Sequence, residues 1–312
     1  MSDTRPPPFD SMVPNNGYHW WYIDALDESG QNGLVIIAFV GSVFSPYYYG
    51  KRQRGDANPE EFCAVNVGIY SGGRKQWSMT ERKASALQSS RDQLAIGPSS
   101  LTWRDGELEI MLRERSAPLG RKVKGRVLLK PEIRSDLVFN LDGRGRHHWH
   151  PWCAQAAVEV DLVKPNRSWN GKAYMDSNWG SEPLEDGFSS WEWSRSHHGA
   201  EVLVDYNSNR IDGSKHSLSL AFSAEKGCRE RSQVNAHPIR KTGWGISRSP
   251  CSEQSLSLVR TLEDTPFYAR SLFQTAGSGN SNWLVHESLS LDRFRSPWVR
   301  LMLPFRMPRK FN

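Results

Sequence analysis

The fold class of this chain is set by the stretch Gln155-Ala156-Ala157-Val158-Glu159-Val160-Asp161-Leu162-Val163. Val158, Val160 and Leu162 share one face of an extended segment, because successive side chains of a strand alternate between its two faces. Glu159 and Asp161 take the other face. This period of two predicts a half-buried β-strand.

Similar strand patterns recur along most of the chain. Turn dipeptides such as Asn32-Gly33, Asp105-Gly106 and Asp212-Gly213 lie between or beside these patterns and favour hairpins. Only residues 80–95 are permissive for a helix. The sequence therefore predicts an all-β protein of antiparallel sandwiches or barrels with little helix. The predicted strands cover residues 18–26, 33–44, 63–70, 107–114, 123–130, 155–163, 168–174, 188–195, 200–206, 216–223 and 283–291.

The length of the chain suggests two domains. It has 312 residues, and one domain takes roughly 150. The polar, turn-rich segment 181–187 is the best candidate for a boundary. We therefore expect an N-terminal domain over residues 17–183, which carries most of the candidate site, and a C-terminal domain over residues 184–312.

Composition and charge exclude several classes of protein. The longest apolar run, residues 34–40, is too short for a spanning helix, and the first fourteen residues lack a secretory signal pattern. We therefore expect a cytoplasmic protein. Its four cysteines form no C-x-x-C pair, which argues against a disulfide framework or a cysteine zinc site. The net charge of +6 is spread singly along the chain without a recognisable motif, so nucleic-acid binding is not expected.

The basic residues leave two interpretations open. They form an ordinary solvated surface, or they attract the chain to an anionic membrane. The densest basic pieces are residues 51–54 and the tail 306–310. Trp298, Phe305 and Phe311 lie among the basic residues of that tail, which is the composition of a membrane interface.

A metal site is one reading of the histidine-rich segment. His147 with His150, or His148 with His150, would supply two ligands, and the pair 197–198 another. No third ligand stands at a recognised zinc spacing, so no metal is expected. The histidines are better explained as members of a hydrogen-bonded polar layer at a strand end.

Tyr174 and Asp176 are the stronger candidates for chemistry. They stand two residues apart on a predicted strand, so they point to the same face. A carboxyl walled by aromatic rings loses solvation, its pKa rises, and it can then act as a proton donor. The alternative is that Asp176 caps a turn before Asn178. Nucleophile-elbow, P-loop and dinucleotide-binding motifs are absent from the sequence, so nucleotide cofactors are not expected.

Several longer segments resemble the carotenoid 1,2-hydratases (hydroxyneurosporene synthases) of photosynthetic purple bacteria. The similarity extends from about residue 17 onward. It is carried by Gly17-Tyr18-His19-Trp20-Trp21-Tyr22-Ile23-Asp24-Ala25-Leu26, by residues 37–48, by Met79-Thr80-Glu81-Arg82, by Ala173-Tyr174-Met175-Asp176-Ser177-Asn178 and by Trp191-Glu192-Trp193-Ser194-Arg195. The resemblance implies two tandem lipocalin-like β-barrels, a fold whose interior can hold an apolar ligand.

The resemblance also implies an activity. This is the cofactor-independent, acid-catalysed addition of water to the terminal 1,2 double bond of an acyclic carotenoid such as neurosporene or lycopene, which gives a tertiary alcohol. The family's catalytic pattern is similar to His147-x-Trp149 and Tyr174-x-Asp176 here. Asp176 would be the acid, Trp149 and Tyr174 would stabilise the carbocation with their ring faces, and His147 would orient water, take its proton or reprotonate Asp176.

Two other functions remain open on the same scaffold. One is a non-catalytic carrier of a polyene, and the other is a cyclase or pericyclase that leaves the mass of its substrate unchanged. The insolubility of a carotenoid in water leads us to expect a peripheral membrane association. The inner or intracytoplasmic membrane, on its cytoplasmic face, is the expected location.

Overall fold

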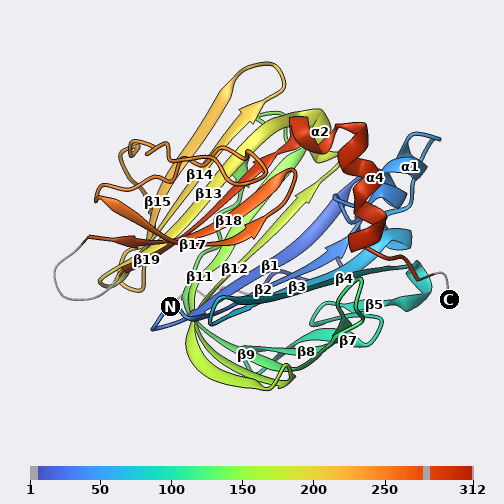
Figure 1. The fold of residues 1–312 in the computed structure, drawn as a ribbon, viewed down its shortest axis with the longest axis horizontal. Coiled ribbons are helices and arrows are strands. Elements are labelled where there is room, and N and C mark those ends of the chain that lie inside the picture. The colour runs from blue at the N-terminus through green and yellow to red at the C-terminus, as the bar shows by residue number, and fades with distance from the viewer. Residues whose placement is uncertain (1–5, 277–281, 311–312) are drawn as a thin grey trace. The chain divides into compact units, whose positions relative to one another are not determined.

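The computed structural model describes residues 6–276 and 282–310 (Figure 1). The chain divides into two compact units. Unit 1 comprises Met1–Pro183 with Leu301–Asn312, and unit 2 comprises Leu184–Arg300. Residues 301–310, which the sequence places in the C-terminal domain, thus belong to unit 1.

Unit 1 is built on one large antiparallel sheet. Its strands follow the order β4-β3-β2-β1-β12-β11-β9-β8-β7-β6-β5, and β10 pairs with β11. The sheet curls until β4 approaches β8 and β3 approaches β6, so it forms a nearly closed barrel. The strands are β1 (Tyr18–Asp27), β2 (Asn32–Val40), β3 (Cys63–Ser71), β4 (Arg74–Arg82), β5 (Leu87–Ser90), β6 (Gln93–Ile96), β7 (Ser99–Arg104), β8 (Glu107–Arg115), β9 (Lys122–Arg134), β10 (Phe139–Asn140), β11 (His147–Lys164) and β12 (Arg167–Gly180).

Unit 2 is built on a second antiparallel sheet of seven strands. Their order is β16-β15-β14-β13-β19-β18-β17. The strands are β13 (Phe188–His198), β14 (Glu201–Arg210), β15 (Lys215–Ser223), β16 (Gly227–Glu230), β17 (Leu256–Asp264), β18 (Tyr268–Thr275) and β19 (Asn282–Ser290).

Helices are short and few among the described residues. They are α1 (Pro46–Arg52), α2 (Leu184–Gly187), α3 (Leu291–Phe294) and α4 (Pro297–Arg306), with 3₁₀ turns at η1 (Pro59–Phe62) and η2 (Ala84–Ala86). None of the helices in the described part of the chain has the length and apolar character needed to cross a membrane. The predicted all-β class is therefore confirmed.

The prediction that residues 80–95 could form a helix is wrong. The segment contains the end of β4, the 3₁₀ turn η2 and the short hairpin of β5 and β6. Leu94 and Ile96 are buried on one face of β6, where they join the apolar core. Packing across the barrel therefore overrides the local helix preference of this segment.

Apolar side chains fill the interior of the unit 1 barrel. Alternate residues of the neighbouring strands point into this core, among them Trp21 and Ile23 of β1, Ile36 of β2 and Met175 of β12. Trp103 and Trp152 meet there edge to face at 5.0 Å between ring centroids. The side chains that point into the barrel thus form one apolar core.

Candidate active site

The candidate catalytic residues lie on the opposite face of the same sheet. On β12, Ala173 and Met175 belong to the apolar core, so Tyr174, Asp176 and Asn178 point away from the barrel interior. All three are nevertheless buried. The strand pairing sets Asp176 opposite Tyr22 of β1.

Asp176 is the centre of a hydrogen-bonded group. Its Oδ2 atom accepts from the indole Nε1 of Trp149 at 2.9 Å and from the hydroxyl of Tyr174 at 3.0 Å. Its Oδ1 atom accepts from Nδ2 of Asn178, also at 3.0 Å. Asp176 lies within β12 and caps no turn, so that alternative is wrong.

The strand register explains why these donors converge. Trp149 of β11 is paired with Asn178 of β12. Asn178 lies two residues from Asp176, so both side chains are on the same face of the sheet. The indole therefore reaches diagonally to the carboxyl, a distance that aromatic side chains span across neighbouring strands. The spacing in the sequence predicted that Tyr174 and Asp176 share a face, and the resemblance included Trp149. The structure adds Asn178 and the hydrogen bond from Trp149 to Asp176.

The phenol of Tyr174 stays neutral in this environment. Burial raises its pKa well above the ordinary value, and the charges of Asp176 and Asp24 raise it further. A neutral phenol can donate a hydrogen bond or accept one. The contact between Tyr174 and Asp176 therefore suits both protonation states of the carboxyl.

Asp24 is a second buried carboxyl that sequence reasoning missed. It is paired with Tyr174 across β1 and β12 and is fully buried on the same face. Asp24 stands within the quoted segment 17–26, but only the register between distant strands brings it to the site. The charge of Asp24 raises the pKa of Tyr174, so Asp24 interacts electrostatically with the group around Asp176.

Aromatic rings surround these polar groups. Tyr22 meets Tyr174 edge-on at 6.2 Å between centroids, and Phe139 lies 5.5 Å from Trp149. Trp20 follows on β1, with its ring 6.0 Å from that of Phe39. The face thus combines two buried carboxyl groups, those of Asp176 and Asp24, with a wide aromatic surface.

His147 lies farther along this face than the sequence suggested. It is paired with Gly180, four residues beyond Asp176 on β12, which is about 13 Å of strand. Its Nδ1 atom is 2.9 Å from the hydroxyl of Tyr18, and its Nε2 atom is 3.0 Å from Oε1 of Glu182. Burial lowers the pKa of His147, and Glu182 and Asp142 only partly oppose this, so the ring is neutral near pH 7.

Gly180 makes room for this histidine. A Cβ atom added at Gly180 would lie 2.6 Å from the ring of Tyr18 and 2.9 Å from Nδ1 of His147. Both contacts are too short for real atoms, so a side chain here would displace the ring. The glycine therefore belongs to the geometry that holds His147.

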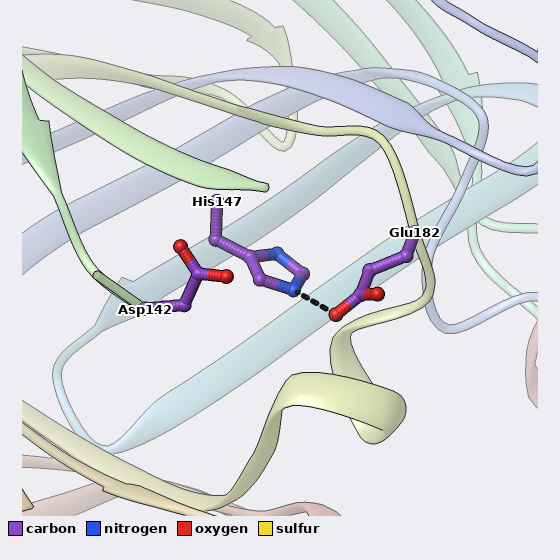
Figure 2. Close-up of side chains that lie close together, drawn as sticks. All are labelled: Asp142, His147 and Glu182. Atoms are coloured by element: carbon purple, nitrogen blue, oxygen red, sulfur yellow. Dashed lines mark hydrogen bonds and ion pairs between the residues drawn. The ribbon is translucent and has the colours of Figure 1, made fainter. Parts of the chain in front are cut away.

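Asp142, His147 and Glu182 form a compact group that the sequence did not reveal (Figure 2). One possible ligand atom from each lies within 4.8 Å of the others, and this is the one such group found among the described residues. The histidine ring stands between the two carboxyl groups and bonds to Glu182. Glu182 stands 35 residues from His147, so no local spacing indicated it.

This group is better explained as an ion-pair network than as a metal site. The guanidinium of Arg146 bonds Oδ2 of Asp142 at 3.1 Å and Oε2 of Glu182 at 2.5 Å, so it already supplies positive charge to both carboxylates. Burial alone would raise the pKa of Asp142. Hydrogen bonds from the backbone N–H groups of Arg144 and Arg146, together with the guanidinium, outweigh it and hold that pKa below its usual value.

The histidine pairs that we had weighed as metal ligands do not converge. Nε2 of His150 bonds the carbonyl oxygen of Ser135 at 2.9 Å, and His148 stacks on Trp179. His197 lies in unit 2, where its Nε2 atom is 2.6 Å from Nη1 of Arg195.

Structural comparison identifies the class of fold. The chain is similar to a crystal structure of a putative AttH from Nitrosomonas europaea, with a TM-score of 0.60 and 15% identity over 92% of this chain and 99% of that one. It is also similar to CghA in complex with Sch210972, with a TM-score of 0.53 and 11% identity over 94% and 97% of the two chains. The fold is therefore of the lipocalin-like AttH type.

Sequence comparison identifies the family within that class. Residues 36–312 match the model of the carotenoid hydratase CrtC. The chain is 46% identical over 308 residues to the acyclic carotenoid 1,2-hydratase of Thiocapsa roseopersicina, covering 98% of this chain and 76% of that protein. The enzyme of the same name from Rubrivivax gelatinosus is 40% identical over 311 residues, covering 97% and 76%. The chain belongs to the carotenoid hydratase family.

Proposed function

We propose that this protein adds water to the terminal 1,2 double bond of an acyclic carotenoid, with Asp176 as the general acid. As a member of the carotenoid hydratase family, it is an enzyme of the hydro-lyase class. The observation that carries the proposed mechanism is the convergence of Trp149, Tyr174 and Asn178 on one buried carboxyl.

The first step transfers a proton from Asp176 to carbon 2 of the terminal isoprene unit. The electron pair of the double bond forms the new C–H bond, and a tertiary carbocation remains at carbon 1. Donors aimed at Asp176 stabilise the carboxylate that this transfer leaves behind, which lowers the barrier to proton release. The Tyr174 hydroxyl can accept from the protonated carboxyl beforehand and donate to the carboxylate afterwards.

The aromatic rings then stabilise the cation. The faces of Tyr22, Trp149 and Tyr174 offer electron density without a nucleophile, and each contact is worth about 0.5–2 kcal/mol when water is excluded. These contacts are too weak to provide the whole rate enhancement. The positioned acid contributes a further factor of roughly 10²–10⁴.

Water completes the reaction at carbon 1. Its oxygen forms the C–O bond, and the proton it loses returns to the carboxylate of Asp176, so the enzyme is regenerated without a cofactor. Because His147 is held by Tyr18 and Glu182 about 13 Å along the strand, we assign it a positioning role at the start of β11 rather than direct proton transfer.

The substrate would lie on the outward aromatic face of β1, β11 and β12. The apolar core occupies the barrel interior, whereas this outward face carries the acid and the rings. We further propose that the protein takes its substrate from the cytoplasmic surface of the inner or intracytoplasmic membrane, because acyclic carotenoids dissolve in lipid.

Mass spectrometry of lycopene or neurosporene incubated with the protein in ordinary and ¹⁸O-labelled water tests this function. Hydration adds the mass of one water and carries the label. Unchanged pigment that co-purifies with the protein would show a carrier instead. Altered pigment of unchanged mass would show a cyclase.

A further inference from the structure

We propose that helix α4 (Pro297–Arg306) attaches the protein to the surface of an anionic lipid bilayer. The proposal rests on the proposed function in one respect: a carotenoid substrate is dissolved in lipid, so its enzyme has to reach a membrane. The evidence is the distribution of apolar and basic side chains on and around this helix, which is labelled in Figure 1.

The outward face of α4 is apolar. Trp298, Leu301, Met302 and Phe305 are all exposed, and Leu301 and Phe305 are exposed to 73% and 76%. These four positions follow the spacing i, i+3, i+4 and i+7, which places them on one side of a helix. Val299 and Leu303 are buried on the other side. A helix that already packs one apolar face therefore presents a second one to solvent.

Trp244 enlarges this apolar face. Its ring stacks on that of Trp298 with 6.3 Å between centroids, and 42% of the residue is exposed. Together with the four residues of α4, it makes five of the thirteen exposed large apolar side chains found in the described part of the chain. Single exposed apolar residues are common, whereas a concentration of this kind marks an interaction surface.

Positive charge accompanies this apolar face. Residues 293–312 contain six basic side chains and no acidic one, a charge equal to the net +6 of the whole chain. Three of the six are paired with acidic side chains: Arg309 with Glu81, Arg295 with Asp292 and Arg300 with Glu185. Arg306 and Lys310 are exposed. Basic side chains beside Trp, Phe and Leu are the composition of helices that lie in the interface of anionic membranes.

A bilayer fits this surface better than a second copy of the chain. A symmetric dimer would bring the same patch of each subunit together, and with it two sets of like charges. Anionic headgroups instead neutralise Arg306 and Lys310. The indoles of Trp244 and Trp298 suit the headgroup level, where tryptophan is enriched.

Sedimentation with lipid vesicles tests the proposal on the full chain. Vesicles of phosphatidylcholine with about one-third phosphatidylglycerol are compared with vesicles of phosphatidylcholine alone. The test variant is Leu301→Glu/Phe305→Glu. The matched control is Leu119→Glu/Met12→Glu, which changes the net charge equally at residues exposed to 73% and 93%. Circular dichroism and thermal unfolding establish that both variants fold.

The proposal predicts that the wild-type protein and the control sediment with the anionic vesicles. The Leu301/Phe305 variant should lose at least tenfold in apparent affinity, and 0.5 M salt should weaken binding of the wild type. Equal binding by both variants, or no binding by the wild type, would overturn it. A dimer in light scattering that only the Leu301/Phe305 variant abolishes, without vesicle binding, would identify a subunit interface instead. Hydration of detergent-dispersed lycopene by the same variants tests the catalytic proposal separately.

Discussion

The indole N–H of Trp149 donates a hydrogen bond of 2.9 Å to Oδ2 of Asp176, although 27 residues separate them in the chain. The two side chains come from neighbouring antiparallel strands, β11 and β12. This bond, with those from Tyr174 and Asn178, fixes the orientation of the carboxyl. The proposed chemistry depends on that orientation.

Replacing Trp149 by Phe keeps an aromatic face but removes the donor. We expect a loss of about tenfold in kcat, because one hydrogen bond to a charged group contributes roughly 1.5 kcal/mol or more. Tyr174→Phe removes the other donor to Oδ2 and should cost a similar factor. The double variant, measured for hydration of lycopene, should lose less than the product of the two factors if both donors act on the same carboxyl. A loss in the double variant equal to the product of the two single factors would argue against a shared role of Trp149 and Tyr174 at Asp176.

Glu182→Gln separates the two roles considered for His147. The change removes the charge that raises the pKa of the histidine but preserves a hydrogen-bond acceptor. With His147 in a positioning role, we expect a modest loss of rate and no shift in the acidic limb of the pH–rate profile. If His147 exchanges protons during turnover, that limb should instead move to lower pH. His147→Ala should cost about 10²-fold, because small misplacements of reacting groups have effects of this size.

His19 makes the fold sensitive to acid. Burial lowers its pKa to about 3, whereas an unfolded histidine titrates near 6.5. Between these values the unfolded chain binds more protons, so the free energy of unfolding falls as pH falls. The contribution is about 1.4 kcal/mol per pH unit. The free energy of unfolding, measured with urea at several pH values between 6 and 4, should therefore fall less steeply with decreasing pH for His19→Gln than for the wild type. Parallel curves would show that His19 does not titrate in this way.

The C-terminal residues are held to unit 1 by a buried ion pair. Arg309 bonds Glu81, and the backbone N–H groups of Glu81 and Lys310 bond the carbonyl groups of Pro308 and Glu81. Burial raises the pKa of Glu81 to about 7, although Ser45 and Arg309 oppose the shift. Arg309→Leu would remove an opposing charge and raise the pKa of Glu81 further, so the variant should lose up to about 1.4 kcal/mol of stability for each pH unit above 7.

The destabilisation by Arg309→Leu should therefore depend on pH. At pH 5.5 Glu81 is largely protonated and the variant should lose little stability, whereas at pH 8.5 it should lose most. Denaturant unfolding at the two values measures the difference. An equal loss at both values would show that Glu81 remains ionised throughout.

The sequence predicted those features that depend on local alternation. Strands 18–26, 63–70 and 107–114 appear as β1, β3 and β8, and Tyr174 and Asp176 share a face. Eight strands were missed, although they complete the two sheets: β4, β5, β6, β7, β10, β16, β17 and β18. Several of these strands are only two to four residues long, too short for alternation to establish a strand.

The remaining features of the site depend on pairing between distant strands. Asp24 reaches Tyr174, and Glu182 reaches His147, only through the register of β1, β11 and β12. Alternation also cannot distinguish which face of a strand encloses the barrel core. For that reason the sequence predicted that Tyr174 and Asp176 line a cavity together. It could not predict that they lie on the face of the sheet that points away from the barrel core.

The most direct test of the catalytic account is the fate of lycopene or neurosporene with Asp176→Asn, in ¹⁸O-labelled water and followed by mass spectrometry. Asparagine keeps the size of the side chain and an acceptor for Trp149 but has no acidic proton. The account predicts that the variant folds, binds the pigment and returns it unlabelled and unhydrated, with turnover reduced at least 10³-fold. Labelled product formed at the wild-type rate would contradict the assignment of Asp176 as the acid.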